Sequence, residues 1–143
     1  MIERSSEIEQ VLHDIIGAMA RSDLDAIEQR TSREACVVGI GSDPAEWTEG
    51  HDQLIQLMRE SLPEAEFQLR ATLDDVTGFR EGDVGWAAGR GSFAVGDQHV
   101  GVRLTAVLHR ENGDWRVVQT HASIGVPNDR MFDPLLRPDA AHP

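Results

Sequence analysis

The amino-terminal part of the chain carries apolar side chains at helical spacing. From Ile8 to Met19 they recur every three or four positions, so they would share one stripe of a helix. Ser6 followed by Glu9 also fits a capping box, which satisfies backbone N–H groups where a helix begins. These patterns predict a helix from about Ser6 to about Ala20.

Shorter elements follow this helix. Ser22 can cap a short helix that runs through Ile27. Residues 35–40 are apolar and rich in β-branched side chains, which predicts a strand. Residues 41–44, Gly-Ser-Asp-Pro, break that strand, and residues 45–50 fit either a second short strand or a loop.

A third helix is expected from His51 to Leu62. Its apolar side chains again fall at helical spacing and would face inward. Pro63 disfavours helical backbone at the residue before it, so the helix should end there.

The second half of the chain alternates between apolar and polar residues, which is the period of a half-buried strand. It predicts four long antiparallel strands over residues 67–73, 84–94, 100–108 and 115–124. The first strand slips out of phase at Asp74-Asp75, where a β-bulge would restore the alternation. Turns are expected at Gly82-Asp83, Gly96-Asp97 and Asn112-Gly113.

Helices in the first half and strands in the second predict an α+β fold, and 143 residues suit one domain with one core. Gly85, Gly89 and Gly91 lie within one predicted strand and favour curvature. We therefore expect a cone-shaped, strongly curved antiparallel sheet packed against the N-terminal helices. The domain would occupy residues 1–127, and residues 128–143 would form an irregular, proline-rich tail.

Charge and composition narrow the classes of partner and compartment. A formal net charge of −12 repels phosphate backbones, which argues against nucleic acid as a partner. No stretch approaches the roughly 20 apolar residues that span a bilayer, and the N-terminus lacks a signal-peptide pattern. We expect a cytoplasmic protein without membrane contact. The single cysteine, Cys36, is expected as a buried thiol in a strand.

Two segments carry a resemblance to a known family. Residues 41–47, Gly-Ser-Asp-Pro-Ala-Glu-Trp, lead to Gly50 and an amphipathic helix, and residues 115–123 read Trp-Arg-Val-Val-Gln-Thr-His-Ala-Ser. Together with the order of elements, they resemble the SnoaL-like branch of the nuclear transport factor 2-like superfamily over roughly residues 5 to 127. The resemblance implies a cystatin-like roll around a pocket and a homodimer through the sheet. The superfamily includes steroid isomerases, polyketide cyclases and domains without chemistry.

Asp43 and His121 are the candidate catalytic residues. Asp43 precedes Pro44 and would be either a turn former or a general base at the mouth of the pocket. His121 would be either a satisfied core residue or a group that binds a ligand carbonyl or transfers a proton. The chain has no tyrosine, so the phenol that steroid isomerase chemistry needs is absent.

Four further residues are candidates for ligand binding. Trp47 would form a pocket wall, Trp86 could face the pocket or the core, and Ser123 would orient a ligand. If the polar face of its strand is concave, Arg103 would lie in the pocket and favour an anionic or carbonyl-bearing ligand. Otherwise it would face solvent or a dimer partner. We expect an enclosed pocket between the third helix and the sheet, lined by both Trp47 and His121.

Three functions remain open at this stage. The first is binding of a small, largely hydrophobic molecule in the cone, with no defined activity. The second is an acid–base enzyme of the isomerase, cyclase or hydratase type that acts on a hydrophobic carbonyl compound. The third is a dimerisation or association module. No metal site and no cofactor are predicted, because metal-ligand spacings and a glycine-rich phosphate loop are absent from the sequence.

Overall fold

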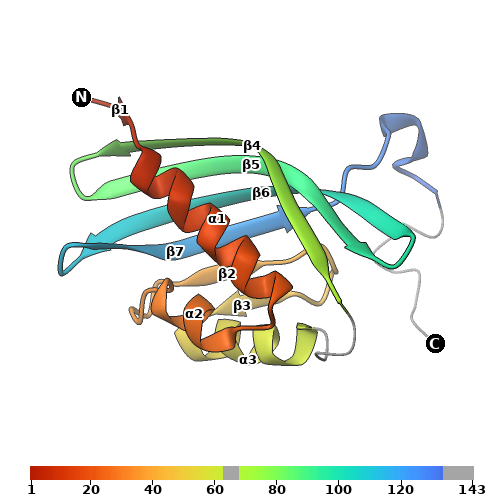
Figure 1. The fold of residues 1–143 in the computed structure, drawn as a ribbon, viewed down its shortest axis with the longest axis horizontal. Helices are drawn as coiled ribbons and strands as arrows, with labels where there is room; N and C mark the ends of the chain where they lie inside the picture. Colours follow the sequence, from red (N-terminus) through yellow and green to blue (C-terminus); the bar gives the residue numbers. More distant parts are fainter. Residues whose placement is uncertain (63–67, 134–143) are drawn as a thin grey trace.

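The computed structural model describes residues 1–62 and 68–133, which build a curved sheet with helices against one side (Figure 1). The helices are α1 (Ser6–Ala20), α2 (Leu24–Gln29), α3 (His51–Ser61) and the short 3-10 helix η1 (Asn128–Arg130). The strands are β1 (Glu3–Arg4), β2 (Val38–Ile40), β3 (Trp47–Glu49), β4 (Arg70–Glu81), β5 (Val84–Val95), β6 (Gln98–Glu111) and β7 (Asp114–Ser123). The predicted α+β class is confirmed.

The strands of the described residues form a single sheet in the order β1-β4-β5-β6-β7-β2-β3. Strands β4 to β7 are the predicted antiparallel meander, with the predicted bulge between Leu73 and Asp75. A second bulge, between Val107 and Leu108, was not predicted. Strand β2 pairs in parallel with β7, so the sheet is mixed at this end. The segment 45–50 contains strand β3, whereas Pro63 and Phe67 lie outside the described residues.

Helix α1 spans the predicted residues, but its N-cap is Ser5 and not Ser6. Ser5 Oγ accepts a backbone N–H of the first turn at 3.3 Å. The Glu9 carboxylate instead accepts from Arg4 Nε at 2.8 Å and from the Gly78 N–H at 3.1 Å. Glu9 therefore joins α1 to β1 and to β4, and the predicted capping box does not form.

The cap of α2 also differs from the prediction. Asp23 Oδ1 accepts the Ala26 N–H at 3.1 Å, so Asp23 is the N-cap and Ser22 is not. Ser22 has a φ of 53°, so its backbone adopts the left-handed conformation in the turn between α1 and α2. A carboxylate satisfies the first N–H groups of the helix and is favoured by the helix dipole at that end.

The prediction of a buried Cys36 thiol within a strand is wrong. Strand β2 begins only at Val38, and Cys36 is exposed in the turn before it. The chain already touches β7 earlier, where the Ser32 N–H donates to the Val117 carbonyl at 2.9 Å. It must leave the sheet and turn before it can return as β2, and the turn carries the thiol into solvent.

The core lies between α1 and one side of the sheet, which we call the inner face; the opposite side is the outer face. Buried side chains of α1 meet buried side chains of β5, β6 and β7, namely Ile8, Val11, Leu12, Ile15, Ala87, Ala106, Leu108, Trp115 and Val117. Trp115 is only 4% exposed and belongs to this core. At Gly85 an added Cβ would collide with the Ile8 side chain, so a glycine lets α1 approach the sheet this closely.

Candidate functional site

The register of the sheet places His121 and Ser123 on the outer face. Thr120 pairs with the buried Ala106, which faces α1, so its neighbours in β7 point to the other side. His121 pairs with Thr105, and Ser123 pairs with Arg103. The polar side of β6 and β7 is therefore the convex one.

Trp47 lies in the same row of the sheet as His121. Ile40 pairs with Trp47 on one side and with His121 on the other, so all three side chains share the outer face. Trp47 is 60% exposed. The expectation that Trp47 and His121 line an enclosed pocket beneath α3 is wrong, because α3 packs on the inner face. Its Leu54 lies where a Cβ on Gly39 would point.

Trp86 also points outward. It pairs with Phe79 of β4, and the two rings stack with centroids 6.2 Å apart. Trp86 is 36% exposed. Gly78 and Gly85, the neighbours of Phe79 and Trp86 in their strands, face Ile8 of α1, so both rings point to the other side of the sheet. The pair forms an aromatic surface of the outer face, separate from the core.

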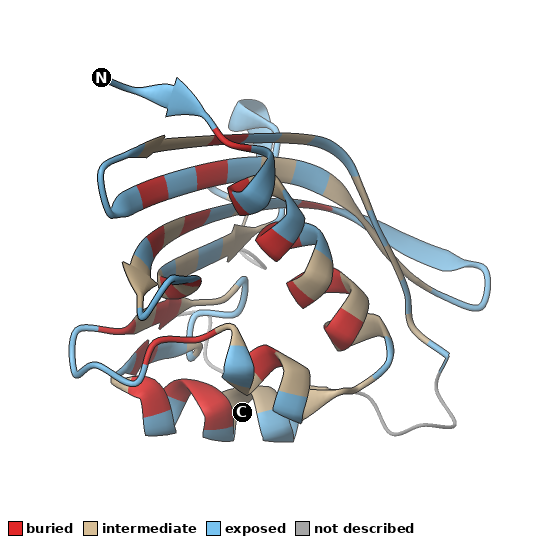
Figure 2. Cartoon of the chain, turned by 60° about the vertical axis from the view of Figure 1, so that its left-hand side comes forward, coloured by how far each residue is buried: buried red, intermediate tan, exposed pale blue. Residues whose placement is uncertain are grey.

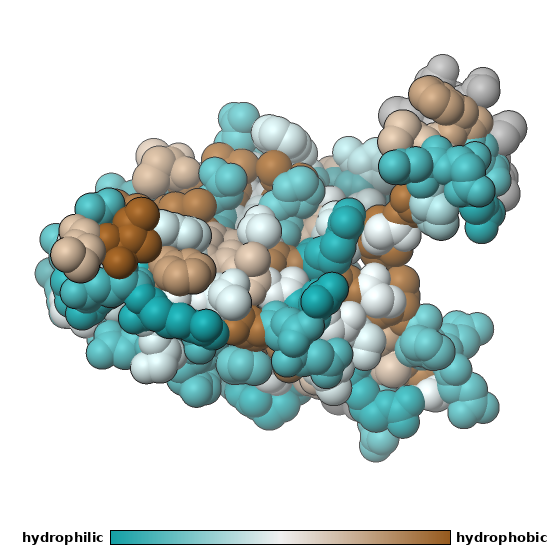
Figure 3. Space-filling model, turned by 90° about the horizontal axis from the view of Figure 1, so that it is seen from above, coloured by the Kyte–Doolittle hydropathy of each residue, from teal (hydrophilic) through white to brown (hydrophobic). Residues whose placement is uncertain are grey.

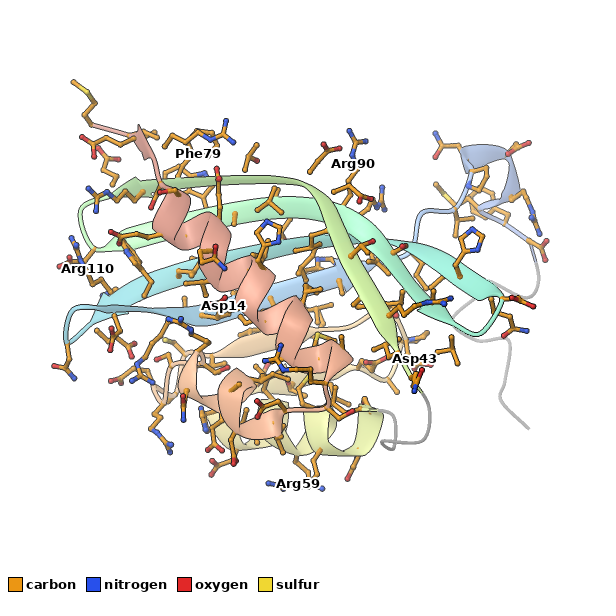
Figure 4. All side chains as sticks on the ribbon, viewed as in Figure 1. Asp14, Asp43, Arg59, Phe79, Arg90 and Arg110 are labelled. Carbon is orange, nitrogen blue, oxygen red and sulfur yellow. The ribbon has the colours of Figure 1, made fainter. Side chains whose placement is uncertain are left out.

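Asp43 lies exposed in the loop between β2 and β3, near the periphery of the molecule (Figure 4). Its Oδ1 accepts the Ala45 N–H at 2.8 Å. Such a bond to the backbone two residues on is an Asx-turn. Of its two predicted interpretations, this geometry matches the turn former.

Arg103 and Ser123 are the two predicted site residues that touch. Arg103 Nε donates to Ser123 Oγ at 3.1 Å. Arg103 also lines a surface groove of about 590 Å³, together with Asp74, Asp75, Arg90, Gly91, His99, Val100, Gly101, Val102, Ile124 and Gly125. In Figure 3 the surface is hollowed between the projecting η1 segment and the β5–β6 hairpin. This groove on the outer face is the first candidate site.

The inner face holds a carboxylate that sequence reasoning missed. A Cβ on Gly41 would meet the Glu46 side chain, which is half-buried across that glycine. Thr48 is two residues further on, buried, and donates from Oγ1 to the Gly39 carbonyl at 3.3 Å. Placing Trp47 outward would have placed both neighbours inward by the two-residue period of a strand.

Side chains of the inner face are less buried toward the β5–β6 hairpin than beneath α1. Ala87, Ala106 and Leu108 are buried where α1 crosses the strands. Beyond that crossing Val102 is still buried, but five other inner side chains are half-buried: Leu73, Phe93, Leu104, Thr120 and Ala122. Figure 2 shows the same change from red beneath α1 to tan and pale blue toward the β5–β6 hairpin. The open end of the inner face, defined by these five residues, is the second candidate site.

A buried polar cluster joins α2 to α3 and was also missed. His51 is 7% exposed, and its Nδ1 lies 2.8 Å from the Ser32 carbonyl oxygen. Its Nε2 lies 3.1 Å from Glu28 Oε1. Ser32 Oγ in turn donates to Glu111 at 2.6 Å. The polar groups of this cluster are partners of one another, so we assign the cluster to the stability of the fold. A histidine at the start of a predicted helix did not indicate from the sequence that its side chain would be buried.

The described part of the chain has no group of three or more His, Cys, Asp or Glu side chains placed to hold a metal ion. Among the residues that the structure describes, no helix combines the length and apolar character that crossing a bilayer requires.

Solved structures with the same fold share little sequence with this chain. An NTF2-like protein of unknown function from Pseudomonas putida KT2440 is 20% identical, with 87% of this chain and 88% of that chain covered and a TM-score of 0.77. An NTF2-like superfamily protein from Salmonella enterica serovar Typhimurium LT2 is 17% identical, with 85% and 91% covered and a TM-score of 0.74. An uncharacterized protein with a cystatin-like fold from Caulobacter vibrioides is 16% identical, with 92% and 96% covered and a TM-score of 0.71.

These likenesses show the fold, and they confirm the predicted cystatin-like roll. No curated protein matches the chain. The family model described as SnoaL-like domain matches residues 8–127, which is most of the chain. The protein therefore belongs to the SnoaL-like domain family.

Proposed function

We propose that this domain binds a small, largely hydrophobic molecule at the open end of its inner face. The observation that carries the proposal is the loss of burial along that face. Leu104 and Leu73 still pack on the edge of the core, whereas Phe93 and Ala122 lie beyond it and are half-buried. Apolar side chains that the fold leaves partly open, on a concave surface, are typical of a ligand site.

Two polar groups could fix the orientation of the bound molecule. Glu46 brings a half-buried carboxylate to the inner side of the β2–β3 hairpin. Thr120 brings a half-buried hydroxyl from β7, next in its strand to His121 and on the opposite face. A few polar groups around an apolar surface give a ligand its orientation and its specificity.

Binding is favoured over acid–base catalysis by what Asp43 and His121 contact. The Asp43 carboxylate is engaged by the backbone of its own loop. His121 lies on the outer face, and among the described residues no hydrogen bond joins the two side chains. A general base and its partner acid must both reach the reacting group. His121 does not share a face with the inner apolar side chains.

The proposal is tested with the neutral fluorescent dye Nile red and two variants at neighbouring positions. Ala122→Phe fills the open end of the inner face, while His121→Phe puts the same ring on the outer face. We expect the dye to bind the wild type, and to bind Ala122→Phe at least about tenfold more weakly. The His121→Phe variant should bind as the wild type does.

NMR amide shifts locate the dye. Shift changes at Leu104 and Ala122 support binding at the inner face. Equal binding by wild type and Ala122→Phe, or loss of binding only in His121→Phe, contradicts the proposal. Dispersed amide spectra of both variants show that they fold, which makes the comparison valid.

The homodimer through the sheet stays a prediction. It would use the outer face, whose central side chains are aromatic, small or apolar: Phe79, Trp86, Ala88, Thr105 and Val107. Sedimentation velocity of the wild type over a range of concentrations measures the oligomeric state. Binding at the inner face does not depend on the outcome.

A further inference from the structure

Arg103 differs from most arginines of this acidic chain. Nine arginines of the described residues lie within 4.0 Å of a carboxylate: Arg4, Arg21, Arg30, Arg33, Arg80, Arg90, Arg110, Arg116 and Arg130. The described arginines without such a partner are Arg59, Arg70 and Arg103. Arg59 donates to Gln56, and Arg70 donates to the Gly96 carbonyl. Arg103 donates through Nε to Ser123 and lines the groove.

A second arginine lies directly opposite Arg103. The register of β5 and β6 pairs Arg90 with Arg103 on the outer face. Like charges at opposite positions of neighbouring strands destabilise a sheet. The Asp75 carboxylate offsets the charge of Arg90, because its Oδ2 accepts from Arg90 Nε at 2.7 Å. The row across three strands holds two guanidinium groups and one carboxylate, and the Asp74 carboxylate also lines the groove. The two arginines and two aspartates balance in formal charge, but only Arg90 is paired with a carboxylate, which leaves Arg103 without one.

The groove has room beside these side chains. A Cβ on Gly101 would find nothing nearer than the Gly91 carbonyl oxygen at 4.0 Å. A Cβ on Gly125 would lie 3.9 Å from Arg103 Cζ. The surface next to the guanidinium is thus bare backbone, over which a small group can approach. His99 adds a further nitrogen-bearing side chain to the lining.

We propose that this outer-face groove binds the oxyanion of a small molecule, a carboxylate or a phosphate, on Arg103 with Arg90 as its neighbour. The planar guanidinium presents paired N–H donors that match two oxygens of such a group. The oxyanion supplies the anionic partner that Arg103 lacks. The site lies on the opposite side of the sheet from the proposed apolar site, and each can exist without the other.

The test is an NMR titration of the amides with sodium acetate and, separately, with inorganic phosphate at constant ionic strength. We expect saturable shifts at Gly101, Arg103 and Gly125 with at least one of the two probes. Saturation with acetate alone identifies a carboxylate site, and saturation with phosphate alone identifies a phosphate site. If neither probe saturates at these amides, the proposal is overturned.

Arg103→Gln should weaken the binding of that probe about tenfold, because a charge-assisted hydrogen bond is lost. Arg59→Gln is the matched control. It removes the same charge from an arginine that also lacks a carboxylate partner, and Figure 4 shows Arg59 and Arg90 on opposite sides of the molecule. Equal weakening by the two substitutions would mean that only net charge matters, which overturns the proposal.

Two further variants do not remove Arg103. Asp75→Asn frees Arg90 from its carboxylate and should tighten binding several-fold, whereas Asp83→Asn removes the partner of Arg110 elsewhere and should not. Gly101→Val fills the groove and should abolish the shifts at Gly125. Unchanged affinity in both Asp75→Asn and Gly101→Val would contradict the proposal even if Arg103→Gln failed to fold.

Discussion

The Nε2 atom of His51 lies 3.1 Å from Oε1 of Glu28, and this contact closes a gap of 23 residues in the sequence. The other ring nitrogen faces the Ser32 carbonyl at 2.8 Å. A carbonyl oxygen only accepts, so the contact with Ser32 is a hydrogen bond donated by Nδ1. The ring therefore bridges α2, the segment after it and the start of α3.

Replacing His51 by phenylalanine should destabilise the fold by about 2 kcal/mol, because the Ser32 carbonyl loses its donor and the half-buried Glu28 carboxylate loses its contact with the ring. Urea denaturation followed by circular dichroism measures the change. His109→Phe serves as the control, since His109 is half exposed, and we expect a change within about 0.5 kcal/mol there. Equal losses in the two variants would show that the His51 bridge contributes nothing specific.

Glu9 should make stability depend on pH. The hydrogen bond from Arg4, followed by the one from the Gly78 N–H, holds the pKa of Glu9 below its ordinary value of 4.5. A carboxylate with a depressed pKa in the folded state stabilises that state above its unfolded pKa and ceases to do so as pH falls through its folded pKa. Glu9→Gln should therefore be less stable than the wild type near neutral pH, and the difference should shrink below pH 4.5.

The control for Glu9 is the same substitution in an Arg4→Ala background. Without the largest cause of the lowered pKa, the effect of Glu9→Gln should be smaller and should change less with pH. Thermal unfolding of the four proteins of this cycle across acidic and neutral pH provides the measurement. A Glu9→Gln effect that is the same at every pH would refute this reasoning.

The elements with a strong local period could be predicted from the sequence. The apolar stripe from Ile8 to Met19 and the alternation of the later strands follow which side chains are buried, so α1, β5 and β7 were predicted with nearly correct bounds. Strand β6 extends three residues beyond its predicted end, and β4 runs to Glu81 although its alternation was followed only to Leu73, where the bulge shifts the phase. Cys36 could not be placed in this way. Its turn follows from the pairing of Ser32 with Val117, a contact between distant parts of the chain.

The same limit applies to the candidate site. Alternation predicts which residues share a face, and Arg103 and Ser123 do share one. It does not predict which face the helices cover, because that depends on how α1 and α3 pack in three dimensions. Trp47 and His121 were therefore placed on the wrong side of the sheet, and Glu46 was overlooked.

Gly91 should not tolerate a side chain. A Cβ there would collide with the backbone carbonyl of Thr72 on the neighbouring strand. We expect Gly91→Ala to destabilise the protein by about 1–3 kcal/mol, because backbone cannot move aside as the end of a side chain can. Gly101→Ala, on the adjacent strand with open space beside it, should change stability by less than about 0.5 kcal/mol. Urea midpoints of the two variants that coincide would contradict the prediction.

The two tryptophans at the ends of the burial range provide the last prediction. Trp115 is 4% exposed, donates from Nε1 to Glu7 Oε2 at 3.2 Å and lies under Arg110, whose Cζ is 5.1 Å from the ring centroid. Trp115→Phe should cost about 2 kcal/mol, since a charge-assisted hydrogen bond and buried volume are lost together. Trp47, 60% exposed, should accept the same substitution within about 0.5 kcal/mol. Emission spectra give an independent check: removing Trp47 should remove the long-wavelength part of the fluorescence, and removing Trp115 the short-wavelength part. A larger loss of stability in Trp47→Phe than in Trp115→Phe would mean that the outer face around Trp47 is covered in solution.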